Sequence, residues 1–213
     1  IRPLERVRRF LPGVELLLQL LAAAASPYVS KVVMAAHHAG VDIEIINVDA
    51  TNGDPRLDNA NPLAKIPCLV LEDGTGLFDS RVITRHLDRI GNGKLFPTAQ
   101  PHLAERMEAL CDGLNDVTVG GIYEMRFRPE EKVHQPWLDR LWDKANRALI
   151  ALADDLPETG ENLNIGGIAL AAALGYLDLR YAGKWEETHP DVRGWQQGFA
   201  AKHANLAALL PAA

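Results

Sequence analysis

The sequence has few cysteines, no surplus of positive charge and no long uninterrupted apolar stretch. Its two cysteines, Cys68 and Cys111, form no CxxC pair and have no metal-ligand spacing with any of the seven histidines. The net charge of −6 excludes a general nucleic-acid surface, which needs a basic face. No segment predicts a membrane span. We therefore expect no metal, no nucleic-acid partner and no membrane partner, and the scarce cysteines favour a cytoplasmic protein.

The composition is that of a globular chain with a full hydrophobic core. Apolar residues make up 47% of the 213 positions and charged residues 23%. Strand-like patterns occur only before residue 90, and helical patterns alone follow. We predict an α/β domain at residues 14–90, a linker at 91–100 and an all-α domain at 101–213.

The first residues imitate a secretory signal peptide, because arginines precede an apolar segment that ends in alanines. Glu15 and Gln19 interrupt that segment, and cleavage after the alanines would remove the only candidate first strand. We therefore predict a buried parallel strand within residues 16–22. Residues 1–13 are expected to be a leader, or an added remnant, outside the fold.

The next segments predict a helix, a strand and a loop. Ser26-Pro27 is typical of a helix start, with serine as the N-cap, and Gly40 of a helix end. Residues 43–48 predict a second strand, and the polar residues 49–60 a loop with room for one helical turn.

An apolar run beginning at Pro67, an Asp-Gly turn and a second short run predict a β-hairpin, and Asp79-Ser80 then opens a capped helix. Proline cannot donate to a sheet ladder, so Pro67 belongs at the strand entrance. A cis bond there would leave the backbone of Ile66 free for a ligand, and an ordinary trans proline is the alternative.

The remaining sequence predicts four helices. Residues 103–117 and 138–156 have apolar positions three and four residues apart, and residues 192–199 give a last short helix. Residues 165–179 are apolar almost all round, which indicates a buried central helix.

Ser26, at a helix N-terminus, is the candidate for chemistry. A hydroxyl among N–H donors could stabilise a ligand thiolate and so lower the pKa of that thiol. No GxSxG elbow surrounds Ser26, so a nucleophilic serine is not indicated. A helix cap without further function is the alternative, and the same holds for Ser80.

Three segments in this order resemble the glutathione S-transferase superfamily, closest to its serine-type cytosolic classes and particularly the bacterial enzymes. They are residues 26–29 (Ser-Pro-Tyr-Val), 61–69 (with Asn-Pro and Lys-Ile-Pro) and 78–83 (Phe-Asp-Ser-Arg-Val-Ile). Residues 169–178, followed by His189-Pro190 and Trp195, are similar to the family's helical domain. Each segment is weak alone, but their combination is specific.

The resemblance implies a thioredoxin-like N-terminal domain with a mixed four-stranded sheet, an all-helical C-terminal domain, and glutathione bound between them in a homodimer. It implies that Ile66 pairs its backbone with the cysteinyl part of glutathione and that Pro67 is cis. Ser80 and Asp79 would hold the γ-glutamyl end and Lys65 the glycyl carboxylate, with Ser26 stabilising the thiolate. The candidates for the pocket of the second substrate are Tyr28, Tyr123 and Trp142.

Two positions depart from the family pattern. Relatives usually carry a basic residue at Ser30, and here only Lys31 remains. The central helix usually begins Ser/Thr-x-x-Asp, whereas here Asn164 is followed by Gly166 and Gly167, so the reciprocal cap is missing. We expect lower stability or a nearby compensation.

We expect a detoxifying enzyme that conjugates the glutathione thiolate to a small electrophile. A non-catalytic glutathione-binding, ligand-binding or regulatory protein on the same fold is the alternative. A disulfide-exchange enzyme would need a cysteine where Ser26 stands. The sequence does not identify the electrophile.

Overall fold

The computed structural model describes residues 18–213, so the expectation for residues 1–13 lies outside the described residues. The α/β part contains β1 (Leu18–Ala22), α1 (Pro27–Ala39), β2 (Ile43–Asn47), α2 (Pro55–Ala60), β3 (Cys68–Val70), β4 (Gly76–Leu77) and α3 (Ser80–Ile90). The helical part contains α4 (Pro101–Phe127), a 3₁₀ turn (Glu130–Lys132), α5 (Gln135–Ala153), α6 (Ile165–Tyr181), α7 (Pro190–Lys202) and α8 (Ala204–Ala207).

The four strands form one mixed sheet in the order β2-β1-β3-β4. β1 runs parallel to β2 and antiparallel to β3, and β4 completes the hairpin with β3. The predicted strand before Ser26, the parallel pair and the antiparallel hairpin are all confirmed. The Ile66–Pro67 peptide bond is cis, as predicted.

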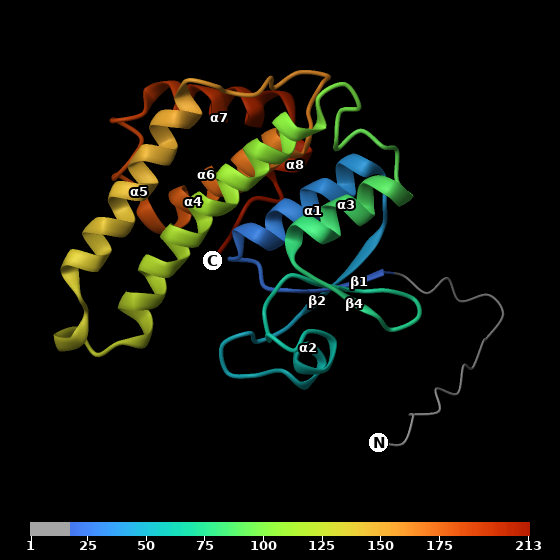
Figure 1. The fold of residues 1–213 in the computed structure, drawn as a ribbon, viewed down its shortest axis with the longest axis horizontal. Helices are drawn as coiled ribbons and strands as arrows, with labels where there is room; N and C mark the ends of the chain where they lie inside the picture. Colours follow the sequence, from blue (N-terminus) through green and yellow to red (C-terminus); the bar gives the residue numbers. More distant parts are fainter. Residues whose placement is uncertain (1–17) are drawn as a thin grey trace.

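Alternating residues of β1 and β3 serve two separate cores. Leu20 pairs with Leu69 and belongs to the large core that also contains residues of α1 and α3. Leu21 pairs with Cys68 and belongs to a small core with Leu57 of α2. Helices α1 and α3 therefore cover one face of the sheet and α2 the other (Figure 1).

The helical turn allowed within residues 49–60 is the helix α2. Asp54 is its N-cap, with its carboxylate accepting from the Arg56 N–H at 2.9 Å, and Pro55 lies in the first turn. Asp-Pro is a helix-start signal, so the start of α2 can be predicted from Asp54 and Pro55 alone.

Helix α6 is the centre of the helical part, and its residues from Ile165 to Leu177 are buried. It packs along α4 on one side and against α1 on the other (Figure 1). The prediction of a buried central helix is confirmed, and α4 extends ten residues beyond the predicted 103–117, to Phe127. Through α6 the helical part shares one continuous core with the sheet and α1.

Residues 18–213 contain neither a membrane-spanning helix nor a cluster of metal ligands. No helix in this range is long and apolar enough to cross a membrane. The same residues contain no group of three or more His, Cys, Asp or Glu side chains arranged to hold a metal ion.

Candidate functional site

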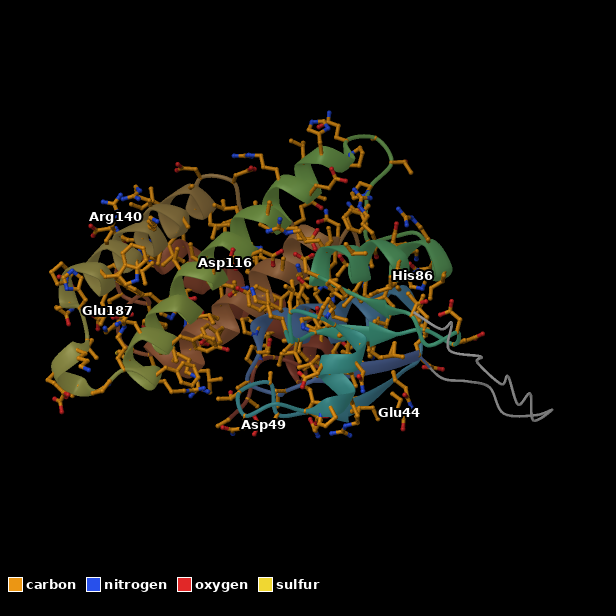
Figure 2. The ribbon with its side chains drawn as sticks, turned by 60° about the horizontal axis from the view of Figure 1, so that its bottom comes forward. Glu44, Asp49, His86, Asp116, Arg140 and Glu187 are labelled. Carbon is orange, nitrogen blue, oxygen red and sulfur yellow. The ribbon has the colours of Figure 1, made fainter. Side chains whose placement is uncertain are left out.

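A cleft of about 910 Å³ lies between the sheet side of the molecule and helices α4 and α6. Asp49, after β2, and Asp116, on α4, line it from opposite parts of the chain (Figure 2). The structure brings eight of the nine residues predicted from the sequence to this cleft: Ser26, Tyr28, Lys65, Ile66, Pro67, Asp79, Ser80 and Tyr123.

Ser26 lies at the N-terminus of α1 with its hydroxyl available to a ligand. Its extended backbone makes it the N-cap, and Oγ accepts from the Val29 N–H at 3.3 Å. A serine hydroxyl also has one hydrogen to donate, and no acceptor among residues 18–213 takes it. An anion in the cleft would meet both this hydrogen and the positive end of α1.

The segment before β3 is held by a buried asparagine. Asn61, 1% exposed, donates from Nδ2 to the Lys65 carbonyl at 2.8 Å and accepts from the Leu63 N–H at 3.0 Å. The sheet ladder starts at Cys68, so Ile66 precedes it and the sheet does not use its backbone groups. The Lys65 side chain is exposed at the cleft.

Asp79 and Ser80 lie at the start of α3. The Asp79 carboxylate accepts from the Arg81 N–H at 3.1 Å and caps the helix. Ser80 is only 3% exposed, yet its hydroxyl has no hydrogen-bond partner in the described part of the chain. A hydroxyl at a helix N-terminus that no protein group uses is suited to a carboxylate ligand.

Tyr28 has its hydroxyl hydrogen committed within the protein. It donates to Asp116 Oδ1 at 2.5 Å across the cleft. Burial, and then the hydrogen bond to Asp116, raise the pKa of the Tyr28 hydroxyl far above its usual range. This phenol therefore stays protonated and, unlike Ser26, has no hydrogen left for a ligand.

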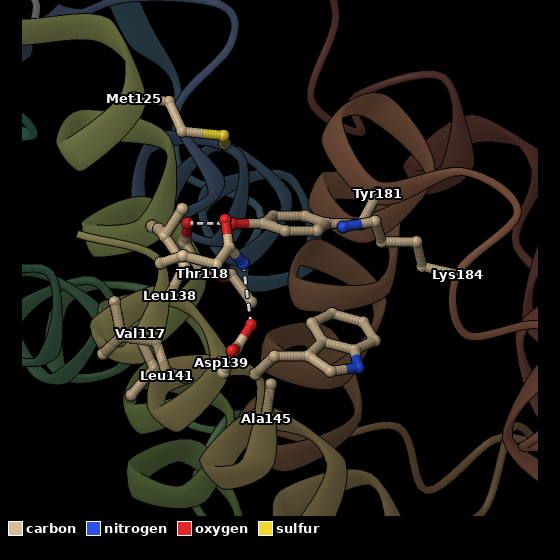
Figure 3. Close-up of a pocket in the computed structure, with 12 residues that line it drawn as sticks. Val117, Thr118, Met125, Leu138, Asp139, Leu141, Ala145, Tyr181 and Lys184 are labelled. Carbon is tan, nitrogen blue, oxygen red and sulfur yellow. Dashed lines mark hydrogen bonds between the residues drawn. The ribbon is translucent and has the colours of Figure 1, made fainter. Parts of the chain in front are cut away.

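Trp142 lies outside the cleft. It lines a separate cavity of about 200 Å³ and stacks on the Tyr181 ring with centroids 5.4 Å apart. The Tyr181 hydroxyl donates to the Thr118 carbonyl at 2.7 Å in that cavity (Figure 3). Trp142 therefore packs α5 against α6, and of the three candidates for the second-substrate pocket only Tyr28 and Tyr123 line the cleft.

A buried ionic network, missed from the sequence, lies beside the cleft. Lys31 of α1, fully buried, places Nζ 3.0 Å from Glu108 and 2.8 Å from Asp112, both on α4. Asp112 also accepts from Arg81 Nε at 2.8 Å, and Glu108 from the Thr84 hydroxyl at 3.0 Å. In the sequence, the sign of this network is that Glu108 and Asp112 are four residues apart, which places them on the same face of a helix.

Sequence comparison agrees with these features. The sequence model described as "Glutathione S-transferase, N-terminal domain" matches residues 25–90. The chain is 31% identical to the uncharacterized GST-like protein YibF of Escherichia coli (strain K12), over 76% of this chain and 83% of that protein. It is 30% identical to glutathione S-transferase 4 of Zea mays, over 85% of this chain and 86% of that protein. The chain belongs to the glutathione S-transferase superfamily.

Solved structures of the superfamily show the same fold. A glutathione transferase family member from Pseudomonas fluorescens Pf-5, with bound glutathione, has a TM-score of 0.83 at 35% identity, covering 92% of this chain and 100% of that one. A structure of a family member from the same strain with bound S-(propanoic acid)-glutathione has a TM-score of 0.79 at the same identity, covering 91% of this chain and 100% of that one. This member of the superfamily has the thioredoxin-like N-terminal and all-helical C-terminal architecture.

Neither cysteine of this chain is a candidate nucleophile. Cys68 and Cys111 are fully buried, and neither lines the cleft. Burial raises the pKa of the Cys68 thiol to about 11, and raises that of Cys111 as well. Any thiolate chemistry in the cleft therefore has to come from a bound ligand.

Proposed function

We propose that this protein is a glutathione transferase of the serine type, in which Ser26 stabilises the thiolate of bound glutathione for attack on a small electrophile. The observation that carries the proposal is the hydroxyl of Ser26. It lies at a helix N-terminus in the cleft, and its hydrogen has no acceptor within residues 18–213.

The other polar groups of the cleft fit the two ends of glutathione. The buried Ser80 hydroxyl, at the N-terminus of α3, takes the γ-glutamyl carboxylate, and the Asp79 carboxylate lies beside it for the ammonium group. The Lys65 ammonium takes the glycyl carboxylate. The backbone of Ile66, unused by the sheet, pairs with the cysteinyl residue between them.

This placement brings the glutathione sulfur to Ser26. The thiol releases its proton to solvent, and the Ser26 hydroxyl donates to the resulting thiolate, which lowers the thiol pKa. The thiolate then forms a C–S bond to the electrophile, and the leaving group departs with the electron pair of its broken bond. Holding both reactants in one cleft supplies the rest of the acceleration.

Two solved structures of one relative support this use of the cleft. The Pseudomonas fluorescens structures with bound glutathione and with bound S-(propanoic acid)-glutathione contain a substrate and a thioether conjugate of the kind proposed here. The cleft has room for both, at about 910 Å³. A homodimer is also proposed, from family membership.

Replacement of Ser26 tests the proposal. We expect Ser26→Ala to lower kcat/KM for conjugation of a chromogenic aryl halide roughly tenfold to a hundredfold, the value of a hydrogen bond to a charged group. Glutathione affinity measured by calorimetry should change little. Ser30→Ala is the matched control, because Ser30 lies on the same helix and its hydroxyl donates to the Leu209 carbonyl, away from the cleft.

The same measurements separate the alternatives. Full activity in Ser26→Ala would move thiolate stabilisation to another group. A wild-type protein that binds glutathione but neither conjugates an aryl halide, epoxide or isothiocyanate nor reduces a hydroperoxide with glutathione would be a binding protein on this fold. Absence of glutathione binding would remove both the site and the mechanism.

A further inference from the structure

The part of the cleft formed by α4 and α6 contains two arginines that the proposed glutathione site does not use. Arg126 lies in the last turn of α4 and Arg180 near the end of α6, and both line the cleft with Tyr123 and Tyr176. Burial raises the pKa of the Tyr176 hydroxyl, and the charges of Arg180 and Arg126, together with a hydrogen bond from the Arg180 side chain, oppose that rise. Both guanidinium groups therefore lie near this hydroxyl.

The carboxylates that line the cleft are engaged elsewhere. Asp112 accepts from Lys31 and Arg81, and Asp116 accepts from the Tyr28 hydroxyl. Asp79 caps α3, and Asp49 accepts from the backbone and side chain of Asn52. Neither Arg126 nor Arg180 forms an ion pair with any residue between 18 and 213.

Arg180 is also left with an unsatisfied donor. Its Nε atom is buried and has no hydrogen-bond partner among the described residues. Buried polar groups in native proteins are nearly always hydrogen-bonded, and a guanidinium is suited to a carboxylate or phosphate. The free donor of Arg180, and two arginines without an ion-pair partner among the described residues, are suited to an anion in this part of the cleft.

Glutathione itself does not account for that anion. Its two carboxylates have proposed partners in Lys65 and Ser80, which lie before β3 and at the start of α3. Arg126 and Arg180 lie on the two helices that form the opposite side, next to Tyr123, a candidate for the electrophile pocket.

We propose that the second substrate of this enzyme carries a carboxylate, which Arg126 and Arg180 bind while the glutathione thiolate attacks elsewhere on the molecule. The inference rests on the proposed transferase function. The substrate class is an acidic electrophile such as a halogenated carboxylic acid. The thiolate displaces halide and forms the C–S bond, the carboxylate is unchanged, and the product is an acidic thioether of glutathione.

Binding of two matched conjugates tests this without turnover. S-carboxyethylglutathione and its amide, S-carbamoylethylglutathione, differ only in the charge of the end group. Calorimetry on the wild-type protein should give a dissociation constant for the acid about tenfold lower than for the amide. The ratio of the two dissociation constants should fall to near unity in Arg180→Gln. Arg180→Lys should keep part of the preference for the acid.

Arg140→Gln is the control, because Arg140 is exposed on α5 and its loss changes the net charge equally (Figure 2). Arg140→Gln should keep the wild-type preference for the acid, and Arg126→Gln should lose that preference. Equal affinity of the wild-type protein for acid and amide would overturn this proposal while leaving the transferase proposal standing. Weaker binding of glutathione itself by Arg180→Gln would also overturn it, since the arginines would then serve glutathione. Binding of neither conjugate nor of glutathione would overturn both.

Discussion

Two hydroxyl groups lie at the start of α1, and their hydrogen bonds give them different roles. Ser26 accepts from the Val29 N–H and keeps its own hydrogen, whereas Tyr28 donates its hydrogen to Asp116. Either residue type could in principle stabilise a thiolate. The partner of each oxygen, which the sequence does not reveal, leaves Ser26 and not Tyr28 with a hydrogen to donate to a ligand.

Removal of the Tyr28 hydroxyl should therefore leave thiolate formation intact. We expect Tyr28→Phe to keep the pKa of the bound glutathione thiol, measured from the ultraviolet absorbance of the thiolate as a function of pH. Asp116 is exposed, so water can replace the lost donor, and the free energy of unfolding should fall by about 1 kcal/mol or less. A clear rise of the thiol pKa in this variant would show that the tyrosine, not Ser26, stabilises the thiolate.

The first turn of α6 explains why two glycines occur where the family pattern has a cap residue. Asn164 caps the helix by accepting from the Gly166 N–H at 2.9 Å. A Cβ on Gly167 would lie 2.7 Å from Cδ1 of the buried Leu163, so that side chain occupies the space beside the glycine. The expectation of lower stability or a nearby compensation for the missing reciprocal cap stays a prediction.

Gly166 is required by the close approach of α6 to α4. A Cβ at this position would lie 2.9 Å from both Cβ and Cγ of Met107, whose Cβ cannot move without its helix. We expect Gly166→Ala to lower the free energy of unfolding by about 1–2 kcal/mol, because overpacking exceeds the gain in helix propensity. Thermal unfolding measures the change.

Gly113→Ala is the matched control for Gly166→Ala. Gly113 lies within α4, and a Cβ there would have no heavy atom within 4 Å. Because the added methyl group meets no neighbour, only the higher helix propensity of alanine changes the free energy of unfolding. This free energy should rise by up to about 1 kcal/mol. A shift of the same sign in both variants would mean that the approach of α6 to α4 does not constrain Gly166.

Local signals in the sequence predicted most of the elements. Ser26-Pro27 and Gly40 lie within one residue of the ends of α1, and Pro67 precedes β3 with a cis bond. These signals work because caps and prolines act on their immediate neighbours. The division at residues 91–100 stays a prediction, although this segment does connect α3 to α4.

Features that depend on tertiary packing were not predictable. Trp142 was a candidate for the second-substrate pocket, but the packing of α5 against α6 places it at a separate, smaller cavity. Arg126 and Arg180 are on different helices, and only the contact of α4 with α6 brings them to one cleft. Lys31 was noted as the basic residue that remains beside Ser30, and its burial between two acids depends on the packing of α1 against α4.

At the scale of the whole molecule, the network around Lys31 joins the α/β part to the helical part. Lys31 and Arg81 come from α1 and α3, and both reach Asp112 of α4. Glu108 completes the network one turn earlier on α4. Because Asp112 and Arg81 also line the cleft, the contact between the two parts and the shape of the site depend on the same charges.

Lys31→Met should be strongly destabilising, by about 3–5 kcal/mol, because it leaves Glu108 and Asp112 buried with only Arg81 to oppose their charge. Addition of Glu108→Gln should recover part of the loss, since Asp112 keeps Arg81 and one buried charge is removed. Chemical denaturation of the single and double variants measures both effects. Lys132→Met, at an exposed position in the 3₁₀ turn, is the control and should be neutral.

The destabilisation by Lys31→Met should also depend on pH. Burial raises the pKa of Glu108, and the charge and hydrogen bond of Lys31 oppose that rise, so loss of Lys31 raises the pKa further. The folded variant then binds a proton more tightly than the unfolded chain, and its stability relative to wild type rises as the pH falls. The difference in unfolding free energy should therefore narrow from about pH 7 to about pH 5. A difference that stays constant over this range, without rescue by Glu108→Gln, would mean that Lys31 contributes through packing of its methylene chain rather than through its charge.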